Sequence, residues 1–376
     1  MGTTNIPYNR PALVGKELEY ITDAIKRLQL SGDGHYTEQC QNWINKRIGC
    51  AGSLLTHSCT AALEMAAILT GIGPGDEVIM PSFTFVSTAN AVVLRGGKPV
   101  FVDVRPDTLN MDENLIVDAI TERTKAIFTV HYAGVCSELD KIRAIADDYG
   151  LWLVEDAAQA LGSTYKGRQA GSIGHLSTIS FHETKNITCG EGGALIINDS
   201  RLMERAEIIR EKGTNRTRFF RGQVDKYTWV DIGSSYLPGE LSAAFLFGQL
   251  ENVDKISAER LRLWNQYNDF LRGLGRNDFT YPHIPDHCEH NGHLYYVLMP
   301  NQEDRANFIG AMKENGIMTP FHYVPLHSAP AGMNYGRAHG PLKVTNDIAE
   351  RLVRLPIFYK LGQEIDDVIK VIEKVL

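Results

Sequence analysis

The chain has 376 residues, of which 43% are hydrophobic and 22% charged, so it is long enough for two domains and ordinary in composition for a globular protein. Its net charge of −7 argues against a general nucleic-acid-binding protein, which needs a basic surface. No apolar run reaches the roughly 18 residues of a membrane span, and the first residues lack the apolar core of a signal peptide. Six cysteines without a CxxC pair are typical of free thiols, so we expect a cytoplasmic protein without a membrane association.

Residues 53–199 alternate short apolar segments with segments of helical pattern. We expect strands at 53–56, 77–83, 99–104, 126–134, 151–156, 176–181 and 193–199, and helices at 59–71, 87–97, 113–120 and 140–148. Short apolar strands that alternate with helices predict an α/β fold, in which a mostly parallel sheet is covered on both faces.

The pattern changes after residue 237. Residues 238–274 predict one long helical region with Pro238 near its start. A strand at 293–299 and helices at 303–315 and 364–375 follow. We therefore expect a large domain at 1–245 and a smaller C-terminal α/β domain at 246–376, with the boundary inside the long helix.

Two motifs favour structural interpretations. Gly71, Gly73 and Gly75 follow a helix and lack the GxGxxG spacing, so they predict a helix stop and a turn in place of a dinucleotide site. The histidines and the cysteine of HIPDHCEHNGH (283–293) crowd one polar loop, which favours surface histidines over a metal site. We expect no bound metal.

A basic segment, REKGTNRTRFFRGQ (210–223), has two interpretations. It is either a solvated loop or a clamp for phosphate groups, with Arg216 and Arg218 as cations and two phenylalanines as stacking surfaces. The residues of the segment do not decide between these alternatives.

A turn and a strand end carry a more specific signal. In LLTHSCTAALEMAA (54–67) a strand leads through Ser58, Cys59 and Thr60 into a helix, an arrangement that either caps the helix or binds a phosphate. Asp156 ends an apolar strand, where ligand crevices form in α/β sheets. It either caps a following helix or faces a ligand, and Gln159 would then share its helical face.

Lys185 lies between the apolar runs 176–181 and 193–199, in SFHETKNITCGEGG (180–193). Considered without the other segments, Lys185 would be interpreted as a solvated loop lysine. A phosphate-binding turn, an acid at a strand end and a lysine on a loop are together the parts that a pyridoxal phosphate (PLP) enzyme needs, because the lysine holds the cofactor covalently and the acid keeps its ring nitrogen protonated.

These segments resemble the fold-type I, PLP-dependent sugar-nucleotide aminotransferases of the DegT type. The resemblance extends over nearly the whole chain, and SCTAAL (58–63), PSFTFVSTAN (81–90), EDAAQA (155–160), the lysine segment and FHYVPLH (321–327) match in order. RGQVDKYTW (221–229) and DIGSSYL (231–237) look most like the subgroup of dTDP-4-amino-4,6-dideoxygalactose transaminases. The resemblance implies the aspartate-aminotransferase-like fold.

The resemblance also implies roles for individual residues. Lys185 would be the catalytic lysine. The cofactor would be held by Cys59, Thr60, Phe85, Asp156, Gln159, Ser180 and Ser235, and the substrate by Arg216, Arg218, Tyr323 and His327. Ser235 stands where many relatives have an asparagine that reaches the neighbouring subunit's site, which is a departure from the family pattern.

The activity implied is transfer of an amino group from L-glutamate to C4 of dTDP-4-keto-6-deoxy-D-glucose, in a homodimer with active sites at the interface. The alternatives are the gluco epimer as product, another nucleotide sugar as substrate, a PLP-dependent sugar dehydratase and a non-catalytic sensor. Relatives that dehydrate replace the lysine with histidine, so Lys185 favours aminotransfer.

Overall fold

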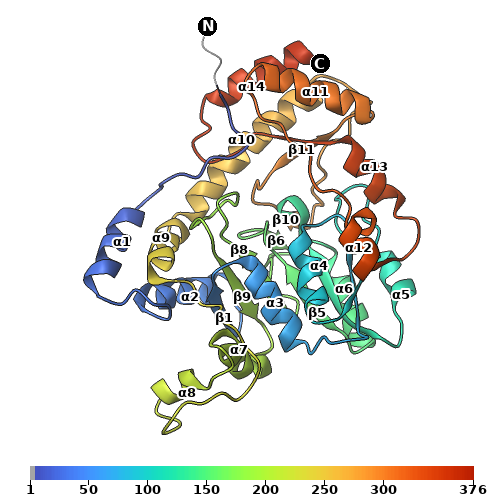
Figure 1. The fold of residues 1–376 in the computed structure, drawn as a ribbon. Coiled ribbons are helices and arrows are strands. Elements are labelled where there is room, and N and C mark those ends of the chain that lie inside the picture. Colours follow the sequence, from blue (N-terminus) through green and yellow to red (C-terminus); the bar gives the residue numbers. More distant parts are fainter. Residues whose placement is uncertain (1–4) are drawn as a thin grey trace.

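The computed structural model describes residues 5–376. Its centre is an eight-stranded sheet in the order β1-β9-β8-β5-β4-β2-β3-β12. Strands β1, β9, β8 and β5 of this sheet are labelled in Figure 1. Strand β9 is antiparallel to both of its neighbours, and the other neighbouring pairs are parallel. The predicted mostly parallel sheet is therefore confirmed. The strands are β1 (Gly52–Thr56), β2 (Glu77–Pro81), β3 (Lys98–Val102), β4 (Thr124–Val130), β5 (Trp152–Asp156), β8 (Leu176–Ser180), β9 (Gly193–Ile197) and β12 (Arg337–Ala338).

Helices cover both faces of this sheet. In β1, Leu54 packs into the core beneath one set of helices and Leu55 into the core beneath the other, because successive side chains of a strand point to opposite faces. The predicted double cover is thus confirmed. One face carries α3 (Cys59–Leu69), α4 (Val86–Val93) and α7 (Met203–Arg210), and the other carries α2 (His35–Ile48), α5 (Ile116–Ala119), α6 (Leu139–Asp148) and α9 (Glu240–Leu250).

The predicted single helix over 238–274 is two helices. Helix α9 ends at Leu250 and α10 (Val253–Gly273) begins after a turn at 251–252, where no proline or glycine marks the break in the sequence. The start of α10 packs with α2 and α9, and its later turns pack into a separate C-terminal core. The domain boundary at residue 245 stays a prediction.

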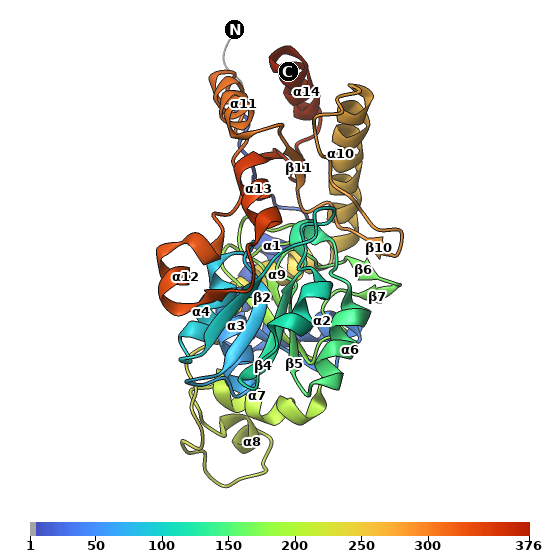
Figure 2. The same ribbon diagram turned by 90° about the vertical axis from the view of Figure 1, so that its right-hand side faces the viewer.

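The C-terminal core joins segments from both ends of the chain. It contains α10, α11 (Gln302–Glu314), α14 (Glu364–Val375) and the antiparallel pair β11 (Tyr295–Leu298) and β13 (Leu352–Leu355). Ile6 lies in the same core, because its backbone N–H donates to Gly316 O at 2.8 Å and its carbonyl accepts from Met318 N at 3.0 Å. This layer lies at the opposite end of the molecule from α8 (Arg216–Phe220) in Figure 2.

The remaining elements are small or lie at the edges of these two cores. They are α1 (Glu17–Lys26), α12 (Pro330–Tyr335), α13 (Lys343–Arg351) and a three-stranded sheet of β10 (Cys288–Glu289), β6 (Thr164–Tyr165) and β7 (Arg168–Gln169). Among residues 5–376, none of the helices combines the length and the apolar composition that crossing a lipid bilayer requires.

Candidate active site

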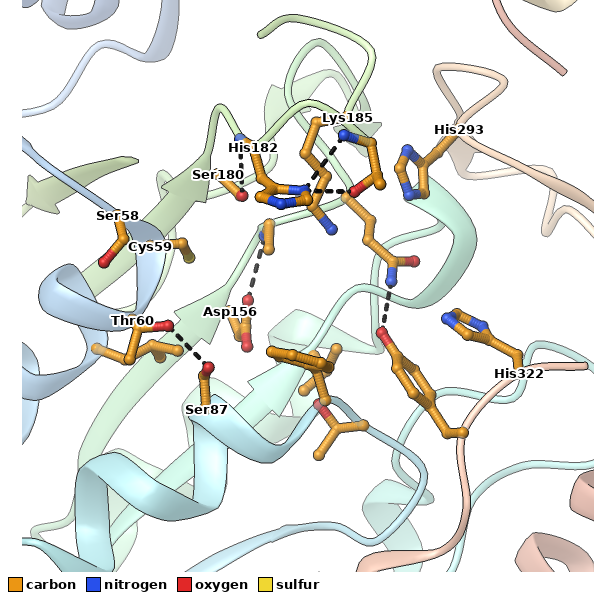
Figure 3. A pocket seen from close by; sticks show the side chains of 18 of the residues that line it. Ser58, Cys59, Thr60, Ser87, Asp156, Ser180, His182, Lys185, His293 and His322 are labelled. Carbon is orange, nitrogen blue, oxygen red and sulfur yellow. Dashed lines mark hydrogen bonds between the residues drawn. The ribbon is translucent and has the colours of Figure 1, made fainter. Parts of the chain in front are cut away.

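A cavity of about 740 Å³ lies where the parallel strands end, between the sheet and the C-terminal core. This is the edge at which open α/β sheets bind ligands. Asp156 at the end of β5 and Ser180 at the end of β8 line it, as do the first residues of α3 and α4. Figure 3 shows the turn at Ser58–Thr60 on one side of the cavity and His293 and His322 on the other.

Lys185 enters this cavity from the link between β8 and β9. The link is a hairpin closed by backbone bonds from Cys189 N to Phe181 O at 2.9 Å and from Glu183 N to Gly190 O at 2.8 Å. Burial lowers the pKa of the Lys185 amine, the charge of Arg354 acts in the same direction, and Cys59 and Asp156 oppose it. The amine therefore loses its proton more readily than a solvated lysine does.

Asp156 is buried and fixed from two directions. Thr88, on α4, donates its hydroxyl to Oδ2 at 2.7 Å, and the backbone N–H of Ala158 donates to Oδ1 at 3.2 Å. Turns follow β5 where the sequence predicted a helix, so the helix-capping interpretation of Asp156 is wrong. The carboxylate faces the cavity.

Gln159 also lines the cavity, although it sits on a turn and no helical face connects it to Asp156. Its Oε1 accepts from Ala133 N at 2.7 Å, and its Nε2 donates to the Tyr323 hydroxyl at 3.0 Å. The ring of Tyr323 stacks on His322 with centroids 3.6 Å apart. Gln159 therefore connects the sheet to the C-terminal segment that forms the opposite wall.

The turn before α3 both caps the helix and lines the cavity. The Ser58 hydroxyl accepts from Ala61 N at 3.1 Å, which makes it the N-cap. Thr60 Oγ1 lies 2.8 Å from Ser87 Oγ, so two hydroxyl groups meet at the start of α3 and α4. Burial raises the pKa of the Cys59 thiol to about 12, which keeps the thiol neutral. A helix N-terminus with nearby hydroxyl groups suits an anion.

Gly193 sets the distance between the lysine hairpin and this turn. A side-chain carbon at that position would lie 2.5 Å from Ser58 C and 2.6 Å from Ser58 O. The start of β9 thus passes directly against the backbone that precedes α3, and only glycine allows this approach.

Phe85 and Ser180 complete the predicted residues that line the cavity. Phe85 immediately precedes α4, and it is 57% exposed although it is a large aromatic residue. The Ser180 hydroxyl accepts from His182 N at 3.3 Å. An exposed ring beside a cavity provides a flat apolar surface for a ligand.

Four predicted residues lie outside the cavity walls of the single chain. Arg216 pairs with Glu211 at 3.0 Å, and Arg218 pairs with Glu204 at 3.0 Å. His327 Nδ1 lies 2.8 Å from Ser82 Oγ, and Ser235 forms a backbone bridge with Glu211. In the described chain these residues are therefore separated from Lys185 and Asp156.

The sequence interpretation missed several residues of the cavity. His293, predicted on the surface, is buried there, with Nδ1 2.9 Å from Asn186 Oδ1; burial lowers its pKa far below the usual value and keeps it neutral. In the part of the chain that the structure describes, no three metal-ligating side chains converge. Tyr8, Ser87, His322 and Arg354 also line the cavity, and Thr88 bonds to Asp156. The sequence analysis gave none of these residues a role, although Ser87, Thr88 and His322 lie in the matching segments 81–90 and 321–327.

Comparison with known proteins gives the same fold. The family model for DegT/DnrJ/EryC1/StrS aminotransferases matches residues 11–376. The spore coat polysaccharide biosynthesis protein SpsC of Bacillus subtilis is 31% identical over 99% of this chain and 97% of its own length. The aminotransferase TlmJ of Streptoalloteichus hindustanus has a TM-score of 0.91 at 28% identity, over 99% of both chains.

A third relative was solved with the cofactor. The PLP form of the putative sugar aminotransferase Spr1654 of Streptococcus pneumoniae has a TM-score of 0.88 at 27% identity, over 99% of this chain and 100% of that one. Aminotransferases of this family depend on PLP, and an amine, a buried carboxylate and an anion-binding turn around one cavity are the groups that this cofactor needs. The chain belongs to the DegT/DnrJ/EryC1/StrS aminotransferase family, is PLP-dependent, and has the PLP fold-type I architecture.

Proposed function

We propose that this sugar aminotransferase moves an amino group from L-glutamate to C4 of dTDP-4-keto-6-deoxy-D-glucose, giving dTDP-4-amino-4,6-dideoxy-D-galactose. The observation that carries the transaminase assignment is that Lys185, Asp156 and the turn before α3 all line one cavity. The choice of sugar rests on the resemblance of segments 221–229 and 231–237 to the subgroup that makes this product.

The residues around the cavity fit the cofactor. Lys185 would hold its aldehyde carbon covalently, and Asp156 would pair with the protonated ring nitrogen. Phe85 would lie on the ring, and Gln159 near the ring hydroxyl. The α3 N-terminus with Cys59, Thr60 and Ser180 would hold the phosphate, since backbone N–H groups and hydroxyl groups converge there.

When bound, PLP stabilises the negative charge that develops on a substrate carbon once a proton leaves it. Lys185 would take and return that proton, and its lowered pKa supports this role because it makes the neutral amine available. Asp156, fixed by Thr88, would hold the positive charge on the ring nitrogen. Lys185 delivers the proton to one face of C4, so its position relative to the sugar sets the axial or equatorial outcome.

The substrate residues are proposed to come from two subunits. Tyr323 lines the cavity of its own chain, and Arg216, Arg218, His327 and Ser235 would act at the subunit interface of a homodimer. Exposed aromatic residues near α8 support an interface there, since Trp229 is 78% and Phe220 68% exposed. We place the enzyme in the cytoplasm, where the six free thiols persist.

One assay tests this proposal. Purified protein, PLP, glutamate and dTDP-4-keto-6-deoxyglucose should yield 2-oxoglutarate and an amino sugar, and NMR of the product gives the configuration at C4. The galacto product with an axial amine is expected. An equatorial amine would contradict the proposed galacto product and identify the gluco epimer as the product. Loss of the C3 hydroxyl without amine transfer would indicate a dehydratase, and absence of any turnover would overturn the transaminase assignment.

A further inference from the structure

His293 is a cavity residue with one ring nitrogen that the described chain leaves without a partner. It lies just before β11 and lines the same cavity as Lys185, and Figure 3 shows it across from the turn at Ser58–Thr60. Its Nδ1 lies 2.9 Å from Oδ1 of Asn186, whereas no group of residues 5–376 forms a hydrogen bond with its Nε2. The residue is buried, but Nε2 keeps access to the cavity.

The bond to Asn186 decides which nitrogen of His293 carries the proton. Asn186 Nδ2 donates to Asn291 O at 3.0 Å, so the amide of Asn186 turns its oxygen towards His293. An amide oxygen only accepts, which makes Nδ1 of His293 the donor. Burial and the positive charges of Lys185 and Arg260 lower the pKa of His293 far below its usual value, so the ring is neutral. A neutral ring with its proton on Nδ1 has a lone pair on Nε2, and Nε2 is therefore an acceptor.

The backbone that carries this ring is fixed from two sides. Arg260, on α10, donates from Nε to Gly292 O at 3.1 Å and from Nη2 to His293 O at 2.5 Å. Asn291 Oδ1 accepts from His293 N at 3.1 Å, and Asn291 Nδ2 donates to Gln159 O at 2.9 Å. The acceptor nitrogen consequently has a defined position relative to both α10 and the turn that follows β5.

Lys185 provides a donor for this acceptor. It directly precedes Asn186, so the hairpin that holds Nδ1 of His293 also carries the lysine. Of the charges that lower the pKa of His293, that of Lys185 has the largest effect, which requires the amine to lie near the ring. The Lys185 amine has no hydrogen-bond partner among the residues that the structure describes. Lysine has a flexible four-carbon stem, so a rotation of the side chain can bring Nζ to Nε2.

We propose that His293 is a positioning residue for Lys185, whose amine donates a hydrogen bond to Nε2 whenever it is not bonded to the cofactor. This inference rests on the proposed transaminase function. A neutral amine has two N–H groups and one lone pair. Donation of one N–H to His293 restricts rotation of the amine and directs its lone pair at the substrate carbon that loses a proton. The other tautomer of His293 would donate to that lone pair and block it.

Nitrogen NMR of cofactor-free protein with isotope-labelled histidines tests the contact itself. The His293 signals, assigned by their loss in His293→Asn or His293→Gln, should show a proton on Nδ1 and a hydrogen-bonded lone pair on Nε2. In Lys185→Ala the Nε2 signal should move to the position of a nitrogen without a hydrogen bond. A proton on Nε2, or an Nε2 signal that is the same in Lys185→Ala, would overturn the proposal.

Two substitutions separate the roles of the two ring nitrogens. Asparagine places a polar atom where Nδ1 lies, and glutamine places one where Nε2 lies. His293→Asn should therefore keep the bond to Asn186, lose the acceptor and slow both half-reactions about tenfold. The isotope effect with glutamate deuterated at the carbon that loses its proton should increase, because proton transfer is the step that is slowed. His293→Gln should stay within roughly threefold of the wild-type rates. His283→Asn, at an exposed histidine of the same polar segment, is the control and should change neither rate.

The half-reactions distinguish this role from direct contact with a substrate. Lys185 acts in both under the proposed function, so a loss confined to one would overturn the inference, since Nε2 would then bind that substrate. Wild-type rates in His293→Asn, or a loss with an unchanged isotope effect, would overturn it as well. If the wild-type protein does not transaminate but the spectra show the bond to Lys185, the proposed function fails and the contact stands. If His293→Asn does not fold, His293→Gln assigns the signals and the spectra alone decide.

Discussion

Thr88 Oγ1 donates a 2.7 Å hydrogen bond to Oδ2 of Asp156. Thr88 lies on α4 and Asp156 ends β5, so the bond joins two elements that are 68 residues apart in sequence. This hydrogen bond fixes the orientation of the Asp156 carboxylate, which enters the cavity from the end of strand β5. The orientation of Asp156 therefore depends on the packing of α4 against the sheet.

We expect Asp156→Asn to keep the fold and bind PLP, and to lower kcat at least about 100-fold, because an amide cannot hold the charge on the ring nitrogen. Rapid-mixing absorbance of the glutamate half-reaction measures this. Thr88→Val should lower the same rate about tenfold by freeing the carboxylate, with the protein's unfolding midpoint nearly unchanged. A half-reaction at the wild-type rate in Asp156→Asn would contradict the assignment of Asp156.

Lys185→Ala should abolish turnover. Borohydride reduction should fix the cofactor to the wild-type chain and leave it dissociable in the variant, because no amine remains there to bond it. Mass spectrometry of the intact protein reads this directly. Lys370→Ala is the control, since the Lys370 side chain is 73% exposed on α14. A Lys185→Ala protein that transaminates near the wild-type rate would make the assignment wrong.

The lowered pKa of Lys185 gives a pH dependence with a definite sign. Only the neutral amine attacks an aldehyde, and a lowered pKa makes that form available at lower pH. The rate at which PLP attaches to cofactor-free protein should therefore rise with pH and level off below the ordinary lysine value of 10.5. Arg354→Gln should move this inflection upward, because one positive charge near the amine is removed. An inflection at or above 10.5 in the wild-type protein would contradict the lowered pKa.

Gly193→Ala should destabilise the protein by about 2 kcal/mol and weaken PLP binding. The added methyl group would meet the backbone of Ser58 and Cys59, which cannot move without displacing the start of α3. Urea denaturation and PLP titration give the two quantities. Gly310→Ala, on the exposed face of α11 with no atom near the added carbon, should stabilise by about 0.5–1 kcal/mol. Equal stabilisation by both substitutions would refute the close approach.

The lowered pKa of Glu77 predicts how the stability of the folded protein changes in acid. Hydrogen bonds from Arg337, with Thr121 and Arg123, lower the pKa of this buried carboxyl from 4.5 to about 2. A depressed pKa stabilises the folded state at pH above 4.5, and this contribution is lost as pH falls from 4.5 towards 2. Glu77→Gln should therefore lower the free energy of unfolding by about 3 kcal/mol at pH 7. Urea denaturation should show that the difference in unfolding free energy between Glu77→Gln and the wild type shrinks below pH 4. A difference that does not change with pH would contradict the lowered pKa of Glu77.

The sequence predicts the fold well, because short apolar strands and amphipathic helices follow from local residue patterns. The C-terminal helix α14 has the predicted bounds, 364–375. The break between α9 and α10 could not be predicted, because its cause is tertiary: the two helices serve different cores. Lys185, Asp156 and Thr60 were found because each stands in a local motif at a strand or helix end.

The roles of other residues at or beside the cavity do not follow from local residue patterns. Arg354 is one polar residue in a short edge strand, and Thr88 is one of several small residues on α4. Tyr8 reaches the cavity only because the segment around Ile6 pairs with Ile317. Their positions depend on contacts across more than 60 residues of sequence, which residue patterns do not encode.

The backbone of Tyr323 affects how this cavity can diverge in evolution. Tyr323 has a φ of 22°, a strained conformation for a residue with a side chain, and its hydroxyl accepts from Gln159. An insertion or deletion in 318–324 would break that bond and release the strained turn. Met318 and Phe321 line the same wall and are 56% and 52% exposed, so replacing them leaves the turn intact. Descendants of this protein that accept other sugars should therefore differ at those two side chains while the length of the loop stays the same.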